Sequence, residues 1–153
     1  MKYYEDIVIG EEVVFPGRYE VTRENITAVG REWDPFPFHV DPRAARDSVF
    51  GELVASTVQL FAITVKLGHT APDMLAALSA LGMNDMRNHA PARAGDVLHV
   101  RCSYLDKRPS RSRPGTGILH SDVRLYNQQD NLIFSYNSGA LIAMRELPQD
   151  RGD

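Results

Sequence analysis

The most apolar run of the sequence, residues 53–67, constrains the fold of this chain more than any other feature. Its large side chains lie on several sides of a helical wheel and form no single stripe, which predicts burial on most faces. Its β-branched residues would also suit a strand, but strands usually have only about five or six residues. A segment of this length without a breaker therefore predicts one buried helix, which ends at Gly68.

The second half of the chain changes to a hydrophobic period of two. Apolar and polar residues alternate over residues 98–104 and again over residues 119–125, as half-buried strands require. Residues 127–131 are polar and predict a turn, and residues 132–144 predict another long strand. Long antiparallel strands that follow one buried helix predict an α+β fold in which the sheet wraps around the helix.

Two other segments carry local signals. Residues 74–81 are rich in Ala and Leu, so they predict a helix that ends at Gly82, and residues 83–89 predict a strand. Near the N-terminus, Thr22 predicts the N-cap of a short helix that runs to Trp33.

Length and composition limit the classes of protein to which this chain can belong. The 153 residues predict one domain over residues 1–148 and a polar tail at residues 149–153. A net charge of −3 provides no basic field for a phosphate backbone, so we expect no nucleic-acid partner. The single cysteine, Cys102, suits a reducing compartment, and no segment has the length of a membrane span or the apolar core of a signal peptide. We therefore expect a cytoplasmic protein without a membrane partner, and the spacing of its histidines predicts no metal site.

The segment from Asp34 to His39 reads Asp-Pro-Phe-Pro-Phe-His and holds two side chains that can transfer protons. Proline fixes its own φ and disfavours helical geometry in the residue before it, so Asp34 and Phe36 should be non-helical. We expect an extended, stiff segment that holds the carboxylate and the imidazole in place before substrate arrives. Taken alone, Asp34 also suits a turn residue, and His39 also suits a structural histidine.

Four blocks of residues occur in one order along the chain: residues 34–41 (DPFPFHVD), 50–56 (FGELVAS), 91–96 (PARAGD) and 112–117 (SRPGTG). Together they resemble the MaoC-like dehydratase family, relatives of the (R)-specific enoyl-CoA hydratases. The resemblance implies the hotdog fold, an antiparallel sheet wrapped around one long central helix. It also implies reversible addition of water to the 2,3 double bond of an acyl-CoA thioester, with coenzyme A as part of the substrate and no separate cofactor.

In that family, the Asp and His of the Asp-x-x-x-x-His pattern form the catalytic acid-base pair, which maps onto Asp34 and His39. A small residue at the start of the central helix supplies a backbone N–H for the thioester oxygen, and this position falls on Thr57, after Ser56. The best-known hydratases have a His-Gly pair there. Because a backbone N–H survives the change of side chain, the resemblance still implies an oxyanion and substrate-binding role for Ser56 and Thr57.

Phe36 stands where the best-known hydratases usually have Asn, and with Phe38 it predicts a dry, apolar substrate pocket. The basic cluster that contains Arg108, Arg111 and Arg113 has two interpretations: it binds the phosphates of coenzyme A, or it forms a solvated strand end. Hotdog sheets typically pair at an edge, so we expect a homodimer or higher homo-oligomer with the pocket at or near the interface.

Three functions stay open at this point. The first is the hydratase or dehydratase that the resemblance implies. The second is an acyl-CoA thioesterase of the same fold, whose relatives generally place a carboxylate on the central helix, whereas residues 53–67 contain none. The third is a non-catalytic acyl-thioester binder. A hydrolase triad of Ser56, His39 and Asp34 is disfavoured, because the chain lacks the glycine-framed turn of such nucleophiles.

Overall fold

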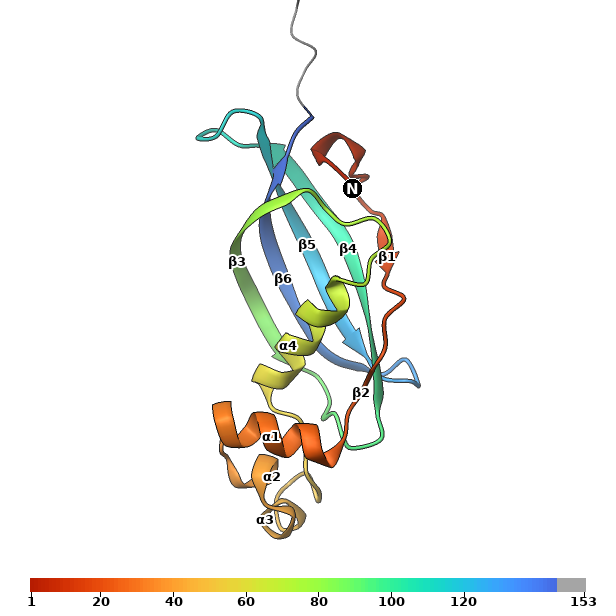
Figure 1. Ribbon diagram of the computed structural model, residues 1–153, viewed down its shortest axis with the longest axis vertical. Helices are drawn as coiled ribbons and strands as arrows, with labels where there is room; N and C mark the ends of the chain where they lie inside the picture. The colour runs from red at the N-terminus through yellow and green to blue at the C-terminus, as the bar shows by residue number, and fades with distance from the viewer. Residues whose placement is uncertain (146–153) are drawn as a thin grey trace, which may run out of the picture.

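One long helix lies inside a curved antiparallel sheet, and three shorter helices gather at one end of the molecule (Figure 1). A computed structural model of the chain describes residues 1–145, so the tail predicted at residues 149–153 lies outside the described residues. The strands are β1 (Glu12–Val14), β2 (Tyr19–Glu20), β3 (Ala77–Asn88), β4 (Val97–Pro109), β5 (Thr116–Tyr126) and β6 (Leu132–Ala143). The helices are the 3-10 turn η1 (Tyr4–Asp6), α1 (Arg23–Trp33), α2 (Pro37–Val40), α3 (Pro42–Arg46) and the long α4 (Thr57–Gly68). The strand order is β1-β4-β5-β6-β3, and β2 also pairs with β4.

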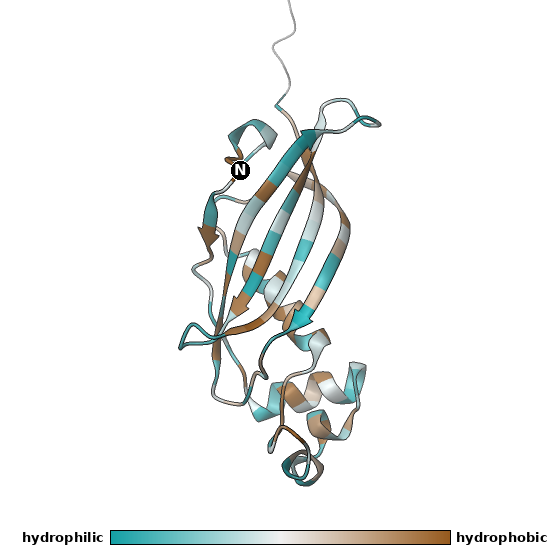
Figure 2. Ribbon diagram, turned by 180° about the vertical axis from the view of Figure 1, so that it is seen from behind, coloured by the Kyte–Doolittle hydropathy of each residue, from teal (hydrophilic) through white to brown (hydrophobic). Residues whose placement is uncertain are grey.

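The strands that the period of two predicts are present as β4, β5 and β6. The predicted turn joins β5 to β6, where Asn127 Oδ1 accepts hydrogen bonds from the backbone N–H groups of Gln129 and Asn131, both at 3.0 Å. Apolar and polar residues alternate along the strands when the sheet is seen from behind (Figure 2). In β4, the apolar side chains of Leu98, Val100, Cys102 and Tyr104 are buried at alternate positions, and His99 between the first two is buried as well.

The central helix α4 is buried against the sheet, as its sequence predicts. Leu60, Ile63 and Leu67 are at most 3% exposed and belong to one buried cluster with Phe134 of β6. At 12 residues, α4 is the longest helix within residues 1–145. Neither α4 nor any other described helix has the length and apolar character to cross a lipid bilayer.

The boundaries of α4 differ from the predicted ones at one end. The helix ends at Gly68 as predicted, but it begins at Thr57 rather than at residue 53. Residues 53–56 run alongside a distant segment instead, since Ala55 N–H donates to the Ala92 carbonyl at 2.9 Å. This pairing connects residues far apart in the sequence, so local hydrophobicity does not reveal it.

β3 replaces the helix that was predicted over residues 74–81. The strand pairs with β6 along its length, and this pairing outweighs the helix propensity of Ala and Leu. Gly82 ends no helix and instead lies within the strand beside a register shift, while the strand predicted over residues 83–89 is confirmed to Asn88. Every residue of β3 is exposed, and the strand forms one edge of the described sheet.

Two of the three shorter helices, α1 and α3, begin at residues whose side chains cap them, Thr22 and Asp41. Thr22 caps α1 as predicted, because its Oγ1 accepts from Asn25 N–H at 3.1 Å and its own N–H donates to Asn25 Oδ1 at 3.0 Å. Asp34 and Phe36 are non-helical as predicted. The extended geometry predicted for the following residues is wrong, since Pro37–Val40 form the helical turn α2. Proline suits the first position of a helix, where its missing N–H has no intrahelical partner to lose.

His99 lies near the start of β4 and is only 7% exposed. Its ring stacks on Tyr126 with the centroids 5.6 Å apart, and its Nε2 lies 3.1 Å from Asp130 Oδ1. Burial is the main cause that lowers the pKa of His99, and the charge of Arg18 lowers it further, whereas Asp130 opposes both.

This lowered pKa predicts a pH-dependent stability. The unfolded chain binds more protons than the folded chain between the lowered pKa and the ordinary value of 6.5, so the free energy of unfolding should rise with pH through that window. Chemical unfolding at about pH 5 and about pH 8 checks this against a His99→Gln variant, in which all other titrating groups are shared. The variant should lose less stability than the parent protein on acidification. An equal loss in both would contradict the assignment.

Candidate active site

Asp34 and His39 are brought together by the packing of α1 against α2. Asp34 is the C-cap of α1, where its N–H donates to the Gly30 carbonyl at 2.9 Å, and His39 belongs to α2. The two helices approach closely at Gly30. A Cβ atom at that position would lie 3.0 Å from both the Cβ and the carbonyl oxygen of His39. Glycine at position 30 therefore permits the approach of the imidazole to the end of α1.

The imidazole of His39 is buried and held in one orientation. Its ring Nδ1 lies 2.6 Å from the carbonyl oxygen of Val54, and the side chain is 7% exposed. Because a carbonyl oxygen can only accept a hydrogen bond, Nδ1 carries the proton. Neutral His39 then presents the lone pair of Nε2, which lies 3.6 Å from Asp34 Oδ2. This separation exceeds a direct hydrogen bond and suits a water molecule that contacts both groups.

A cavity of about 300 Å³ opens beside His39. We call it the His39 cavity; it is lined by Phe38, His39, Phe50, Val54, Ala55, Thr57, Leu60, Asn88, His89, Ala90 and Pro91. The Phe38 ring packs edge-on to the imidazole, with centroids 4.6 Å apart, and lies 5.2 Å from the Phe50 ring. Phe36 stacks on the outer side of Phe38 and is 60% exposed, so it does not line the cavity. The apolar pocket predicted from the two phenylalanines is thus built from Phe38 and Phe50.

The N-terminus of α4 supplies polar backbone groups to the same cavity. Ser56 is buried and caps the helix, since its Oγ accepts from Gln59 N–H at 3.2 Å. Thr57 lines the cavity, and its Oγ1 accepts from Asn88 Nδ2 at 2.9 Å. Within residues 1–145, the N–H groups of Thr57 and Val58 form no hydrogen bond. They belong to the positive end of the helix dipole and can stabilise a developing negative charge.

The basic cluster predicted to bind phosphates lies far from this site within the chain. Arg108 is near the end of β4, and Arg111 and Arg113 lie in the loop that joins β4 to β5. Figure 1 shows this loop at the end of the sheet opposite to α1, α2 and α3. The structure of one chain therefore does not bring these three arginines to His39.

A larger cavity of about 510 Å³ lies at the C-terminal end of α4 and shares no lining residue with the His39 cavity. Its walls are mostly apolar and include Val65, Leu75 and Cys102. Burial raises the pKa of the Cys102 thiol to about 11, and that of the Tyr104 hydroxyl to about 12. Both groups are thus neutral at neutral pH.

Several residues of the site escaped the sequence analysis. Val54 acts through its backbone carbonyl, which no side-chain pattern reveals. Phe50 and Asn88 come from segments that only the fold brings beside α4, and Phe50 at least lies within one of the four blocks. Within the described residues, no three His, Cys, Asp or Glu side chains come together as metal ligands.

Comparison with known proteins places the chain in a family. The model of the MaoC like domain matches residues 6–125. YdeM of Bacillus subtilis strain 168 is 32% identical over 127 residues, which cover 80% of this chain and 86% of YdeM. A crystal structure of a MaoC-like dehydratase from Rhodospirillum rubrum is 33% identical with a TM-score of 0.89, covering 96% of this chain and 100% of that one.

The fold extends to more distant proteins. The unliganded (R)-hydratase PhaJ1 from Pseudomonas aeruginosa is 19% identical with a TM-score of 0.73, and the alignment covers 94% of this chain and 86% of PhaJ1. The match of the family model and the close similarity to the R. rubrum structure agree with the sheet and central helix described above. The chain therefore belongs to the MaoC-like family and has the hotdog fold.

Proposed function

We propose that this protein catalyses the reversible addition of water to the 2,3 double bond of an acyl-CoA thioester. The proposal depends on one observation above all: the Nε2 atom of His39 faces Asp34 Oδ2 at 3.6 Å, while Val54 fixes the opposite ring nitrogen. This arrangement is suited to hold a water molecule and to move a proton. The R. rubrum MaoC-like dehydratase and PhaJ1 have the same fold as this chain, which supports this class of reaction.

In the hydration direction, a water molecule contacts both Asp34 Oδ2 and His39 Nε2 from the side of the substrate. The water oxygen bonds to C3 of the substrate while His39 Nε2 takes one of its protons, and the electrons of the double bond move towards the thioester oxygen. The Asp34 carboxylate stabilises the imidazolium that forms. The proton then passes from Nε2 to C2 as the thioester carbonyl is restored. Dehydration follows the same steps in reverse.

The negative charge on the thioester oxygen needs its own partner during this reaction. The free N–H groups of Thr57 and Val58 lie at the N-terminus of α4, and Thr57 lines the His39 cavity. We place the thioester oxygen at these groups and the reacting carbon atoms between them and His39. Removing one such donor typically costs about 100- to 1,000-fold in kcat, so these amides matter as much as the acid-base pair.

A single assay separates the proposed reaction from its alternatives. The protein is incubated with a medium-chain enoyl-CoA, and the loss of the conjugated absorbance is followed together with the release of free thiol. Loss of absorbance without thiol supports hydration, whereas thiol release would indicate a thioesterase. A thioesterase is less well supported because α4 carries no Asp or Glu. Binding without either signal would indicate a non-catalytic acyl binder.

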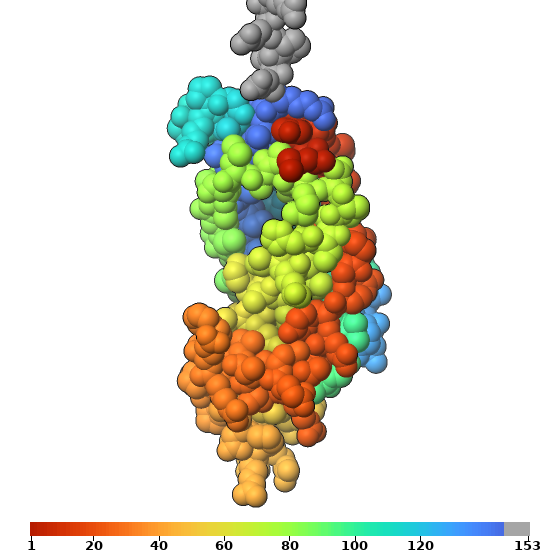
Figure 3. All heavy atoms as spheres, in the orientation of Figure 1, coloured from red at the N-terminus to blue at the C-terminus, as the bar shows by residue number. Residues whose placement is uncertain are grey.

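We further propose that the active form is a homodimer that pairs through β3. All twelve residues of this edge strand are exposed in the single chain, and Figure 3 shows a hollow between β3 and α4 in which atoms of β6 are visible. Both α4 and β3 carry exposed apolar side chains, including Val58, Val65 and Met83, which are 39% to 43% exposed. An exposed strand edge beside exposed apolar side chains is typical of a surface that a second chain covers.

The dimer predicts a specific result in gel filtration with light scattering. The protein should elute at twice the chain mass of 17.1 kDa. A Met83→Lys variant should shift towards the monomer, because the new charge would be buried at the interface. Leu105→Lys is the matched control, since Leu105 is 47% exposed on β4, away from the β3 edge. A parent protein that is a monomer at high concentration would contradict the proposal.

A further inference from the structure

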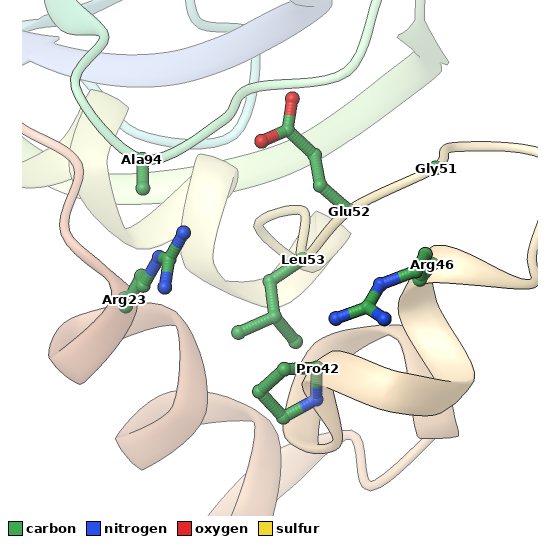
Figure 4. Close-up of a pocket in the computed structure, with 7 residues that line it drawn as sticks. All are labelled: Arg23, Pro42, Arg46, Gly51, Glu52, Leu53 and Ala94. Carbon is green, nitrogen blue, oxygen red and sulfur yellow. The ribbon is translucent and has the colours of Figure 1, made fainter.

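A small polar pocket lies beside the His39 cavity. Its volume is about 180 Å³, and we call it the arginine pocket; it is lined by Arg23, Pro42, Arg46, Gly51, Glu52, Leu53 and Ala94 (Figure 4). Residues 51–53 of this lining are flanked in sequence by Phe50 and Val54, which line the His39 cavity. The two cavities therefore lie against the same short segment of the chain.

Two cations of the arginine pocket have no acidic partner. Arg23 begins α1 and Arg46 ends α3, and within residues 1–145 neither guanidinium forms a hydrogen bond or an ion pair. Glu52 is the one acidic residue of the lining, and its Oε1 is bound to Arg93 Nη1 at 2.9 Å. In Figure 4 the two guanidinium groups lie on either side of Leu53, and the Glu52 carboxylate points away from Arg46. The lining thus presents two uncompensated positive charges.

This combination of charge and size indicates a phosphate group as the ligand. Guanidinium groups bind phosphate oxygens through paired N–H donors, with better geometry than an ammonium group offers. A volume of 180 Å³ is about six times the space that one water molecule occupies in the liquid. A phosphate ester therefore fits, and it would offset the repulsion between the two arginines. The exposed side of both residues leaves a path for the rest of the ligand.

We propose that the arginine pocket binds a phosphate group of the carrier that bears the acyl thioester. This inference rests on the proposed function for the identity of the ligand. If the thioester oxygen lies at the N-terminus of α4, a carrier that leaves the His39 cavity on the side of Phe50 reaches the arginine pocket, because residues 51–53 follow Phe50 directly in the sequence. Arg23 and Arg46 take the role that the sequence suggested for Arg108, Arg111 and Arg113.

A pair of binding measurements tests the site without requiring turnover. Calorimetry compares a saturated acyl-CoA with the same acyl group on pantetheine, which lacks phosphate. In an Arg23→Ala/Arg46→Ala double variant, the Kd for acyl-CoA should rise about tenfold or more, because two charge-assisted contacts are lost at a solvent-exposed site. The Kd for acyl-pantetheine should not change. Arg43→Ala, on the same helix as Arg46 but outside both cavities, is the matched control and should bind both ligands like the parent protein.

Further ligands and one further variant identify the phosphate and exclude the distant cluster. Dephospho-CoA retaining the full affinity of CoA would assign the pocket to the diphosphate, and a loss of affinity would assign it to the 3′-phosphate. Inorganic phosphate that binds at the same site without competing with acyl-CoA would overturn the carrier assignment. An Arg108→Ala/Arg111→Ala/Arg113→Ala variant should bind acyl-CoA normally, and a loss there instead of in the double variant would also overturn it.

The outcomes separate this inference from the proposed function. Suppose that the parent protein binds acyl-CoA, that the double variant binds it more weakly, and that the parent does not hydrate enoyl-CoA. The phosphate site is then confirmed, and the proposed reaction is wrong. If the parent protein hydrates enoyl-CoA while the double variant keeps the parent Kd for acyl-CoA, the proposed reaction is confirmed and the phosphate site is wrong. If the parent protein binds neither thioester, the phosphate site is wrong.

Discussion

An Asp34→Asn variant should lose about 100- to 1,000-fold in kcat for hydration of enoyl-CoA, the range typical of removing one group that stabilises developing charge. The amide keeps the size of the carboxylate, so the C-cap of α1 and the water-binding space should persist. What it lacks is the negative charge that stabilises protonated His39 at 3.6 Å. Steady-state kinetics by loss of the conjugated absorbance measures the effect, and chemical unfolding verifies that the fold is intact.

Asp41→Asn is the matched control for this change. Asp41 precedes α3, where its Oδ1 accepts from Arg43 N–H at 2.8 Å, and the amide oxygen of Asn can accept the same bond. Asp41 lines neither the His39 cavity nor the arginine pocket. Its variant should therefore keep the parent kcat. Unchanged hydration by Asp34→Asn would show that the central assignment is wrong.

His39 offers a second test, because its two ring nitrogens have separate roles. In a His39→Asn variant, the amide nitrogen takes the place of Nδ1 and can still donate to the Val54 carbonyl, but no group remains at Nε2. We expect kcat to fall by about 100- to 10,000-fold while the fold keeps most of its stability. Kinetics and urea unfolding on the same preparation measure both quantities.

The comparison variant is His39→Ala, which removes both nitrogens. The buried carbonyl of Val54 then loses the donor that lies 2.6 Å away, and an unsatisfied buried group costs about 1–3 kcal/mol. Both variants should show a similar loss of kcat, but only His39→Ala should be clearly destabilised through this carbonyl. Wild-type activity in His39→Asn would exclude Nε2 as the atom that carries the proton. Equal stability in the two variants would mean that the contact with Val54 contributes little.

Much of the sheet could be predicted from the sequence, because β4, β5 and β6 alternate apolar and polar residues as a half-buried sheet demands. β3 could not. Its residues include good helix formers, and all of its side chains are exposed in the single chain, so no period of two marks it. The strand exists because β6 offers it a partner, and such pairing between distant segments leaves no local signal.

The candidate site likewise has a part that the sequence predicts and a part that it does not. Asp34 and His39 were predictable because a proline-rich segment and three further blocks accompany them. Their relation in space was not, since it depends on α1 packing against α2 and on a backbone carbonyl of Val54. Arg23 and Arg46 have no distinguishing pattern at all, because isolated arginines at the ends of exposed helices are usual in any protein.

The close approach at Gly30 bears on how such a protein diversifies. The contact between α1 and α2 sets the distance between the carboxylate and the imidazole. The side chains of residues 35–38 therefore do not need to set this distance. Phe36 and Phe38 belong to this intervening segment, and Phe38 forms a wall of the His39 cavity. Changes in the Phe38 side chain can therefore reshape this cavity, while Gly30 and Val54 still position the imidazole beside Asp34. Under the proposed function, substrate selectivity and proton transfer can therefore evolve separately, although they depend on the same six residues of sequence.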